Sequence, residues 1–418
     1  MGDDLRFAFD PRAAGFRILP RPGRAPEVVR VRALHGPFRA GPSDERIQVV
    51  DATNKASFKD DHTLRYRRPP PVVPFQGRVR TPVAPDPDGG FLSVEPGTRE
   101  FLAAAAFGAA RCTFEIWRHH FQRDLPWHFD REAGGRGAAL HLFPRVRSAN
   151  SWVGEGFMEF GFDRYPDEGY EKRPFALNFD AVAHEMGHLM MKSLHGNPPF
   201  DERSIQYRAH EEAAADLIAA IAVMHFDSVV EASLERTGGL LHGATALSLV
   251  SEWGRSRRLK ADARNLYNDV TVGEVRRKED PEPDKFSLSL AFSGAAFDAL
   301  LGVFYVNLAD RGVLPAKIAG GAFHRPGHEP AAGVRAAVTR AYARDAGAFK
   351  TALLDARDHL ARSLARAWRS VSPVGLTFSR VLARLLDEEA RLAAERGRPP
   401  HTALLRASFA ARGIAAVA

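Results

Sequence analysis

The sequence is short of cysteine, of long apolar runs and of apolar residues near its start. Cys112 is the one cysteine among 418 residues, which excludes a framework of intrachain disulfides. A membrane-spanning helix needs roughly 20 uninterrupted apolar residues, and the best candidate, Leu217–Phe226, is about half as long. The opening stretch MGDDLRFAFDPRAAGF carries acids and a proline where a secretory signal has its apolar core. We therefore expect no membrane span, and a protein that is cytoplasmic or exported without a cleavable signal peptide.

The charge balance is positive without being concentrated. The net charge is +7, most cations are arginine, and they are interleaved with acids along the chain. A basic balance can favour nucleic acid or membrane surfaces, but no aromatic-basic array typical of a nucleic-acid reader stands out. The sequence therefore predicts a solvated arginine-rich surface and no specific nucleic-acid partner. A basic surface-binding protein stays an alternative, and it predicts steeply salt-dependent binding.

Length and composition predict a globular protein of more than one lobe. Apolar residues make up 45% of the chain and charged residues 26%, and 418 residues are long for a single core. Residues 1–90 are rich in Pro, Gly and Arg, above all in Arg67–Gly90, and predict an irregular arm or linker with a few short strands. Residues 91–196 predict an α/β lobe, and residues 197–418 a mostly helical lobe.

Hydrophobic periodicity places the elements of the two lobes. A helix is predicted from Thr98 to Phe121, and another runs to about Leu194 after a cap at Asn178 or Asp180. Strands are predicted at Ala138–Val146, Gly156–Phe162 and Phe175–Asn178. Later helices are predicted near residues 204–226, 228–236, 239–254, 289–310, 331–345, 347–370, 374–395 and 400–413, with a long loop containing short elements over Arg255–Asp284.

The most informative motif is His184-Glu185-Met-Gly-His188 on the helix that follows Asp180. Two histidines one helical turn apart leave the same face and can meet one ion. Neutral imidazoles suit Zn²⁺ in a tetrahedral site with one position open for water, and Glu185 lies beside that face, within reach of such a water. The bland interpretation is two surface histidines and an ordinary glutamate.

A second motif argues against surface histidines without a metal. Its sequence is His210-Glu211-Glu212-Ala-Ala-Ala-Asp216. A catalytic zinc needs a third protein ligand and an acceptor that orients a ligand histidine. Glu212 and Asp216 lie one turn apart on a predicted helix, so Glu212 is the expected metal ligand and Asp216 the expected acceptor. Glu211 is the competitor for the ligand role, but no acid follows it one turn later.

The pair of motifs resembles the gluzincin metallopeptidases, and specifically their thermolysin-like branch. The metzincin pattern fails, because it needs Gly at 191 and His at 194, where this chain has Met191 and Leu194. The resemblance implies an α+β fold: a zincin-like α/β N-terminal lobe followed by a mostly α-helical C-terminal lobe, with zinc in the cleft between them. It covers residues 95 to 310, and the motifs follow in the family's order.

Smaller segments agree with the thermolysin-like pattern. Asn150-Ser-Trp152, followed by Met-Glu-Phe-Gly161, is similar to an edge-strand segment whose backbone pairs with an extended substrate in the family, so Asn150 and Ser151 are candidate substrate-binding residues. Packing at a sheet edge explains them equally well. Arg264 matches a family arginine that contacts the substrate carbonyl, and Ser293-Gly294 resembles a conserved helix start.

The chain departs from the family at the oxyanion. Family members place a histidine before the Ser-Gly helix start, where this chain has Asp284-Lys285. Losing one oxyanion donor typically costs about a hundred- to a thousand-fold in rate. The other possible donors are Lys285, Tyr207, Tyr267 and His242. Of these, Tyr207 joins Asn150, Ser151 and Arg264 as a candidate substrate-binding residue.

The sequence therefore predicts a zinc metalloendopeptidase acting on a peptide or protein substrate. His184, His188 and Glu212 would hold Zn²⁺, and Glu185 would activate the zinc-bound water as general base. The alternative is a degenerate, non-catalytic zinc-binding module with a structural or regulatory role. The missing oxyanion histidine favours that alternative, and the intact Glu185 argues against it.

Overall fold

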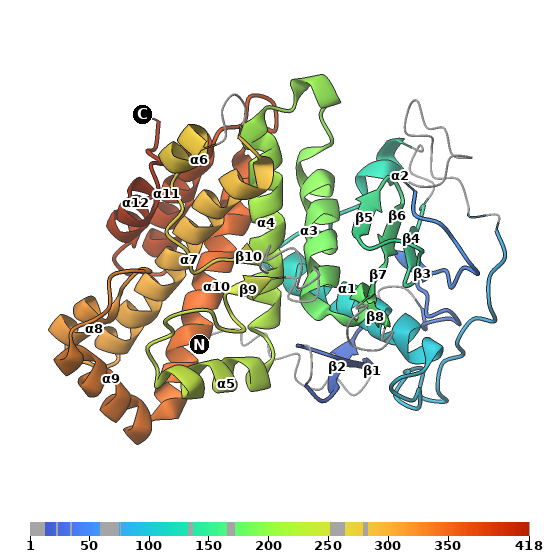
Figure 1. The fold of residues 1–418 in the computed structure, drawn as a ribbon, viewed down its shortest axis with the longest axis horizontal. Helices are drawn as coiled ribbons and strands as arrows, with labels where there is room; N and C mark the ends of the chain where they lie inside the picture. The colour runs from blue at the N-terminus through green and yellow to red at the C-terminus, as the bar shows by residue number, and fades with distance from the viewer. Residues whose placement is uncertain are drawn as a thin grey trace. The chain divides into compact units, whose positions relative to one another are not determined.

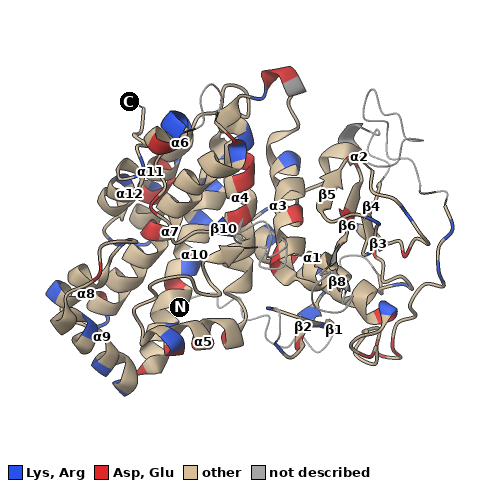
Figure 2. Cartoon of the chain, in the orientation of Figure 1, with Lys and Arg blue, Asp and Glu red and all other residues tan. Residues whose placement is uncertain are grey.

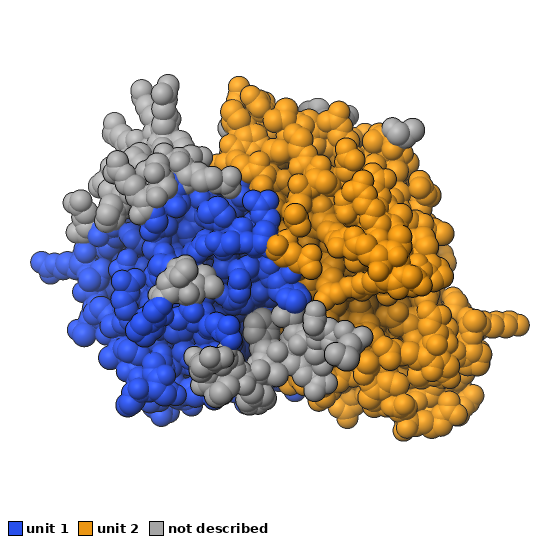
Figure 3. All heavy atoms as spheres, turned by 180° about the vertical axis from the view of Figure 1, so that it is seen from behind, with its two compact units in different colours: residues 1–119, 123–193, 251–263 blue, residues 120–122, 194–250, 264–418 orange. Residues whose placement is uncertain are grey.

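The structure is a computed structural model that describes residues 13–21, 24–33, 36–58, 75, 77–132, 137–164, 172–250, 264–278 and 283–417. These residues divide into two compact units, coloured separately in Figure 3. Unit 1 comprises the described residues up to His119 together with Arg123–Ser193, and unit 2 comprises His120–Gln122, Leu194–Val250 and the described residues from Arg264 onward. Helices predominate and the sheets are small, so the predicted α+β class is confirmed.

Unit 1 contains all but two of the strands in the described part of the chain (Figure 1). The strands are β1 (Ala14–Ile18), β2 (Glu27–Val31), β3 (Ile47–Val49), β4 (Leu140–Phe143), β5 (Ser151–Gly154), β6 (Phe157–Phe160), β7 (Phe162–Arg164) and β8 (Lys172–Pro174). The helices are α1 (Arg99–Phe121), α2 (His128–Glu132), the 3₁₀ turn η1 (Phe175–Leu177) and α3 (Phe179–His195).

A four-stranded sheet of order β3-β4-β6-β5 forms the centre of unit 1. Strands β3, β4 and β6 run parallel, while β5 pairs antiparallel with β6 and forms one edge. The pairs β1–β2 and β7–β8 are separate antiparallel ribbons. The segment 1–90 thus supplies an edge strand of this sheet, β3, in addition to irregular chain.

Aromatic side chains from distant segments build the core of unit 1. Phe16 of β1 is fully buried and stacks on Phe91 with ring centroids 5.2 Å apart. It also contacts Phe107 of α1 at 5.4 Å. The helix begins where the sequence predicts, because Thr98 Oγ1 accepts a hydrogen bond from Phe101 N at 3.1 Å. Burial of these rings positions α1 against the N-terminal ribbon.

Unit 2 consists mainly of helices (Figure 1). They are η2 (Phe200–Glu202), α4 (Ile205–Val223), α5 (Asp227–Thr237), α6 (Val272–Lys278), α7 (Lys285–Asp310), α8 (Ala316–Ala322), α9 (Ala332–Arg344), α10 (Ala346–Ser370), α11 (Phe378–Glu395) and α12 (Thr402–Ala410). The short strands β9 (Leu249–Val250) and β10 (Arg264–Asn265) pair antiparallel. Among the described helices, α8 is one that the sequence analysis did not predict.

Helix α7 is the central helix of unit 2. It packs against α4, α10 and α12. It starts four residues before the predicted residue 289, because Asp284 caps it by accepting from the backbone N of Phe286 and Ser287. By length and mean hydropathy of 1.6 it could span a membrane, but 83% of that apolar window is buried by the protein itself. We therefore interpret it as a core helix.

The predicted helix over residues 239–254 is wrong for the residues that the structure describes. Helix α5 ends at Thr237, Gly238 takes a left-handed cap with φ +56°, and Leu241 also has positive φ. The chain then forms turns and reaches β9. Leu240, Leu241 and Leu247 are buried, and Tyr305 Oη donates a hydrogen bond to the carbonyl of Leu240. Apolar residues at helical spacing were therefore buried by tertiary packing without forming a helix.

The predicted strand over Phe175–Asn178 is also wrong. These residues form the 3₁₀ turn η1, in which Asn178 N donates to Phe175 O at 2.9 Å. Pro174 fixes φ at −66° just before the turn. Periodicity cannot separate a short apolar run in a strand from one in a tight turn. The turn leads directly into α3 and sets where that helix begins.

Charged residues are distributed as the sequence suggests. Figure 2 shows Lys and Arg interspersed with Asp and Glu over the helices of unit 2, without a single basic face in that view. Pairs such as Arg366–Glu395 at 2.8 Å and Lys350–Asp227 at 3.0 Å are typical of this surface. In these pairs, cations of unit 2 are neutralised locally by acids of neighbouring helices.

Candidate metal centre

Helix α3 brings the two predicted histidine ligands together in unit 1. The Nε2 atoms of His184 and His188 lie 3.0 Å apart, and the ring planes are inclined at 87°. Their residues are 5% and 9% exposed. The pairing follows from the spacing, because residues i and i+4 are neighbours on a helix surface. Glu185, the next residue around the helix, is half-buried.

The spacing of the two nitrogens fits a shared metal ion. Two imidazole nitrogens on one tetrahedral zinc, each about 2.0–2.1 Å from it, lie roughly 3.3 Å apart. The observed 3.0 Å separation needs only a small ring movement to match. Nitrogen ligands of this kind suit Zn²⁺ among biological cations.

The rest of α3 is held in place by burial and by one ion pair. Val182, Met186, Leu189 and Met190 are fully buried, as expected for the face away from the histidines. In the first turn, Arg21 Nη1 donates to Asp180 Oδ2 at 2.9 Å, and both side chains are almost inaccessible. Asp180 therefore anchors the start of the helix through a distant arginine, in addition to favouring the helix N-terminus by its charge.

Helix α4 of unit 2 carries the predicted acidic pair. Glu212 is 4% exposed and Asp216 is fully buried. They lie one helical turn apart, as the Glu-x-x-x-Asp spacing requires. Glu211, the competing ligand, is half-buried. The structure thus places Glu212 and Asp216 on the more buried side of α4, and the choice of Glu212 over Glu211 as metal ligand stays a prediction.

Two cations hold the Glu212 carboxylate. Arg264 Nη1 donates to Glu212 Oε2 at 3.1 Å, and Lys285 Nζ donates to Glu212 Oε1 at 2.6 Å. Arg264 also reaches Asp216, with Nε 3.0 Å from Oδ1. One guanidinium therefore spans both acids of α4.

The fold explains how residues far apart in sequence reach α4. Strand β9 packs against α4, and β10 pairs with β9 in the register Arg264 to Val250. This brings the Arg264 side chain to the acids. Lys285 is the first residue of α7, which also packs on α4, and the cap at Asp284 fixes that helix end. Arg264 thus orients carboxylates, while its predicted contact with a substrate carbonyl stays a prediction.

The predicted substrate-binding strand lies at a sheet edge. Ser151 begins β5, and Asn150 precedes it with its Oδ1 accepting from Ser151 N at 2.9 Å. The Asn150 carbonyl accepts from Gly161 N at 3.0 Å. A Cβ at Gly161 would lie 2.1 Å from Ser148 O, so only glycine permits this close approach. The geometry is that of an edge strand, and substrate contact by Asn150 and Ser151 stays a prediction.

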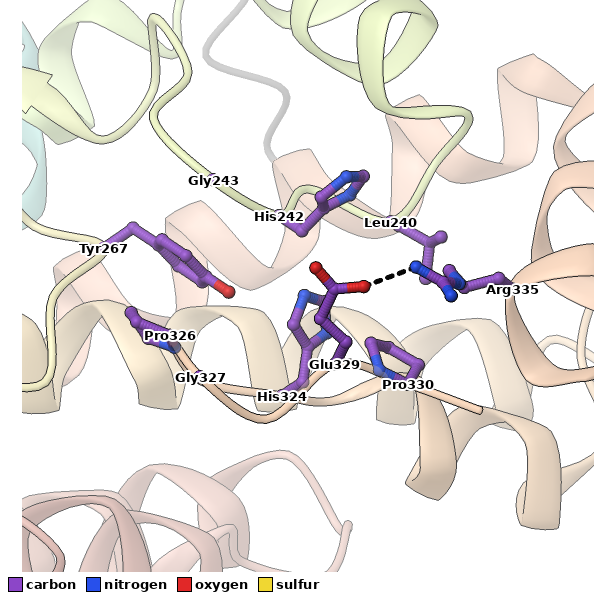
Figure 4. Close-up of a pocket in the computed structure, with 10 residues that line it drawn as sticks. All are labelled: Leu240, His242, Gly243, Tyr267, His324, Pro326, Gly327, Glu329, Pro330 and Arg335. Carbon is purple, nitrogen blue, oxygen red and sulfur yellow. Dashed lines mark hydrogen bonds and ion pairs between the residues drawn. The ribbon is translucent and has the colours of Figure 1, made fainter. Parts of the chain in front are cut away.

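The other predicted oxyanion donors lie in different surroundings. Tyr207 is 6% exposed on the first turn of α4. Burial, with a smaller contribution from Glu211, raises the pKa of its phenol well above the ordinary value. Tyr267 and His242 line a cavity of about 170 Å³ in unit 2, together with His324 (Figure 4). Burial raises the pKa of Tyr267 as well.

This cavity is distinct from the predicted metal ligands. Figure 4 shows Glu329 paired with Arg335, with His324 among the other residues that line the cavity. His324 Nδ1 lies 2.7 Å from Ala322 O, so that nitrogen carries the proton. Lys285, by contrast, is bound to Glu212 itself. Lys285 Nζ lies 2.6 Å from Oε1 of this predicted metal ligand.

Sequence reasoning missed the partners of these acids. It considered Lys285 only as an oxyanion donor, not as a partner of Glu212, and it did not consider Arg21 at all. The contacts of Arg21 with Asp180 and of Lys285 with Glu212 span 159 and 73 residues. The available signal was chemical: a buried carboxylate needs a cation or hydrogen-bond donors. That rule indicates that a partner exists without identifying which of the 58 Lys and Arg residues it is.

Comparison with known proteins finds similarity to solved structures and not to sequences. No protein-family profile and no curated protein matches the sequence. Among solved structures, the chain is similar to the precursor of protealysin, a metalloproteinase from Serratia proteamaculans. The match covers 79% of this chain and 89% of that one, with 11% sequence identity and a TM-score of 0.35.

Proposed function

We propose that the chain is a zinc-dependent metallopeptidase of zincin-like two-lobe architecture, with Zn²⁺ held by His184, His188 and Glu212. The observation that carries this proposal is the 3.0 Å separation of the two histidine Nε2 atoms on α3. Two neutral imidazoles and a carboxylate are the ligand set of a catalytic zinc that keeps one position open. The substrate class is a peptide or protein.

The chain's own residues would perform the proton transfers. When bound, zinc acts as a Lewis acid that acidifies water and polarises a carbonyl. The Glu185 carboxylate accepts a proton from the attacking water, whose oxygen bonds to the carbonyl carbon of the substrate. Glu185 then delivers that proton to the amide nitrogen as the carbon–nitrogen bond breaks. No covalent bond to the protein is formed.

Arg264 and Asp216 would serve as positioning residues. The guanidinium contacts both acids of α4, so it restrains the Glu212 carboxylate in the rotamer that the structure shows. The Lys285 ammonium on Glu212 Oε1 adds a second restraint. Both cations also reduce the electron density on Glu212, which weakens its affinity for a metal ion. The two cations therefore make Glu212 a better-oriented metal ligand and at the same time a less basic one.

The first test is metal content and cleavage on the same preparations. Protein purified without added metal would be examined by elemental analysis, as wild type and as His188→Ala. We expect His188→Ala to hold one zinc fewer per chain. Glu212→Gln should lose zinc as well, and Glu211→Gln, its neighbour on α4, is the matched control that should retain it. Equal zinc in wild type and His188→Ala would refute the site.

The second test separates catalysis from metal binding. Glu185→Gln keeps the shape of the side chain and removes its basicity, so it should retain zinc and lose cleavage of a mixed peptide library by at least about a hundred-fold. Identical cleavage profiles for wild type and Glu185→Gln would eliminate the peptidase proposal. Retained zinc without cleavage in the wild type would favour the non-catalytic zinc-binding module.

A further inference from the structure

Unit 2 contains a second group of potential metal ligands, formed by His120, His225 and Asp358. One ligand atom from each residue lies within 4.8 Å of the others. His120 is near the C-terminal end of α1, in the segment assigned to unit 2, His225 follows the end of α4, and Asp358 is in the middle of α10. Residues separated by more than 230 positions are thus brought to one point.

The tautomer of His225 suits metal binding. Its Nδ1 lies 3.0 Å from the carbonyl oxygen of Ile221, one helical turn earlier. A carbonyl can only accept, so Nδ1 carries the proton and Nε2 presents a lone pair. Metal-ligating histidines are typically oriented in this way, with the second ring nitrogen donating to a backbone carbonyl.

Asp358 is oriented by a neighbouring arginine. Arg357 Nε donates to Asp358 Oδ1 at 2.7 Å, and Arg357 Nη1 donates to the Met224 carbonyl at 2.9 Å. The Arg357 side chain is 6% exposed; its contact with the Met224 carbonyl is buried, and its contact with Asp358 is partly buried. One guanidinium therefore fixes the carboxylate and also the backbone directly before His225. A supporting contact of this kind orients a metal-binding carboxylate.

We propose that His120, His225 and Asp358 form a second metal site, for a divalent transition ion of which Zn²⁺ is the first candidate. Two imidazoles and one carboxylate suit zinc and leave a fourth position for water. His120 is 2% exposed, whereas the Asp358 side chain is 22% exposed, so an ion can enter from the Asp358 side. The site is independent of the proposed peptidase centre, because it shares no residue with it.

A third group, His359, Glu389 and His401, also has its ligand atoms within 4.8 Å, but its hydrogen bonds argue against a metal. His359 Nε2 lies 2.7 Å from Glu389 Oε2, and Arg398 contacts His359 Nδ1. Both ring nitrogens are therefore engaged, and metal binding would require breaking one contact. Glu389 additionally accepts from Ser363 Oγ and His401 N, each at 2.9 Å. This group is a satisfied polar network that joins α10 and α11.

Metal stoichiometry tests the second site. We expect wild-type protein to hold two zinc ions per chain, and His225→Ala and Asp358→Asn each to hold one fewer. His119→Ala, on the residue next to His120, is the matched control and should leave the content unchanged, as should His401→Ala in the third group. His188→Ala should remove one ion and His188→Ala/His225→Ala both. Equal metal in wild type and in both site variants would overturn the proposal.

The design separates this proposal from the peptidase centre. If His225→Ala loses a metal and His188→Ala does not, the second site stands and the peptidase centre fails; the reverse result overturns the second site alone. If the purified protein holds no metal, chelator-treated His188→Ala would be titrated with ZnCl₂ by calorimetry. One saturable equivalent, absent from His188→Ala/Asp358→Asn, supports the site, and no saturable binding overturns it.

Thermal unfolding distinguishes a variant that has lost the metal site from one that has failed to fold. An ion that binds only the folded state raises the melting temperature. Added ZnCl₂ should therefore raise the melting temperature of His188→Ala and leave that of His188→Ala/Asp358→Asn unchanged. Asp358→Asn keeps the size of the side chain, so its circular dichroism should match that of the parent. A zinc-dependent shift of equal size in both proteins would contradict the assignment of these ligands.

Discussion

The guanidinium of Arg264 bridges the two acids of α4, with Nη1 3.1 Å from Glu212 Oε2 and Nε 3.0 Å from Asp216 Oδ1. Asp216 is fully buried, so its charge depends on close partners. Arg264 belongs to the two-residue strand β10 and not to a helix. The contact makes Arg264 a structural requirement of the acidic pair.

Replacement of Arg264 should therefore cost stability. Removing one partner of a buried ion pair lowers the free energy of unfolding by about 3–5 kcal/mol, and Arg264→Ala should approach the lower end because the arginine is 20% exposed. Arg264→Lys keeps the positive charge but lacks the planar guanidinium that reaches both acids. Its free energy of unfolding should therefore lie between those of wild type and Arg264→Ala. Urea denaturation followed by circular dichroism measures the loss. An unchanged midpoint for Arg264→Ala would show that the bridge is dispensable.

The His359–Glu389 pair should make the protein sensitive to acid. Burial opposes the charge of Glu389, but hydrogen bonds from His359, His401 N and Ser363 outweigh it and lower the pKa of the carboxyl to about 2. Because this pKa is below the unfolded value, the stabilisation is complete above pH 4.5 and is lost as the pH falls from 4.5 towards 2. Burial also lowers the pKa of His359, so its contribution is lost below about pH 6.5.

Unfolding free energies measured at successive pH values test this. We expect wild type to lose about 2–3 kcal/mol more than Glu389→Gln between pH 4.5 and 2. Glu395→Gln is a suitable control, because that carboxylate is exposed and pairs with Arg366 at the surface. Parallel pH profiles for wild type and Glu389→Gln would contradict the assigned role.

Gly161 should not tolerate a side chain. A Cβ there would lie 2.1 Å from Ser148 O and 2.7 Å from Asn150 O, both backbone atoms that cannot move independently. Gly161→Ala should lower the free energy of unfolding by about 3 kcal/mol or more. Gly320→Ala, in α8 with open space around its Cβ, should instead stabilise by roughly 0.5–1 kcal/mol. Melting temperatures that shift equally for both variants would exclude this explanation.

Cys112 should be unreactive in the folded protein. Burial in α1, with a smaller effect from Glu115, raises the pKa of its thiol to about 12. The thiolate is the reactive form of cysteine, and with this pKa it is scarce at neutral pH. Cys112 is also only 3% exposed, so a reagent cannot reach its sulfur in the folded protein. A chromogenic disulfide reagent should label about one thiol in denaturant and essentially none without it. Fast labelling of the native protein would indicate that α1 opens locally.

Features set by neighbouring residues were predictable. The start of α1 at the Thr98 cap follows from local hydrogen bonding, and so does the pairing of His184 with His188 on one face of α3. The buried face of α3 likewise follows from its periodicity. These predictions succeeded because a helix surface is determined within about four residues, whatever the rest of the chain does.

Elements that depend on packing were less predictable. The apolar residues after Gly239 form turns and the β9–β10 ribbon, and the run at Phe175 forms a 3₁₀ turn. In both cases the hydrophobic pattern correctly indicated burial. The backbone conformation was decided by a left-handed cap at Gly238 and by Pro174, together with what packs on each segment.

The sequence by itself determined the chemistry available on each helix: two imidazoles one turn apart on α3, and two acids one turn apart on α4. Tertiary structure alone decided which distant groups meet them. Arg264 and Lys285 reach Glu212 from 52 and 73 residues away, Arg21 reaches Asp180 from 159 residues away, and His120 meets His225 and Asp358. Such contacts leave no periodic trace in the sequence, because they depend on how whole elements pack and not on the spacing of residues within one of them.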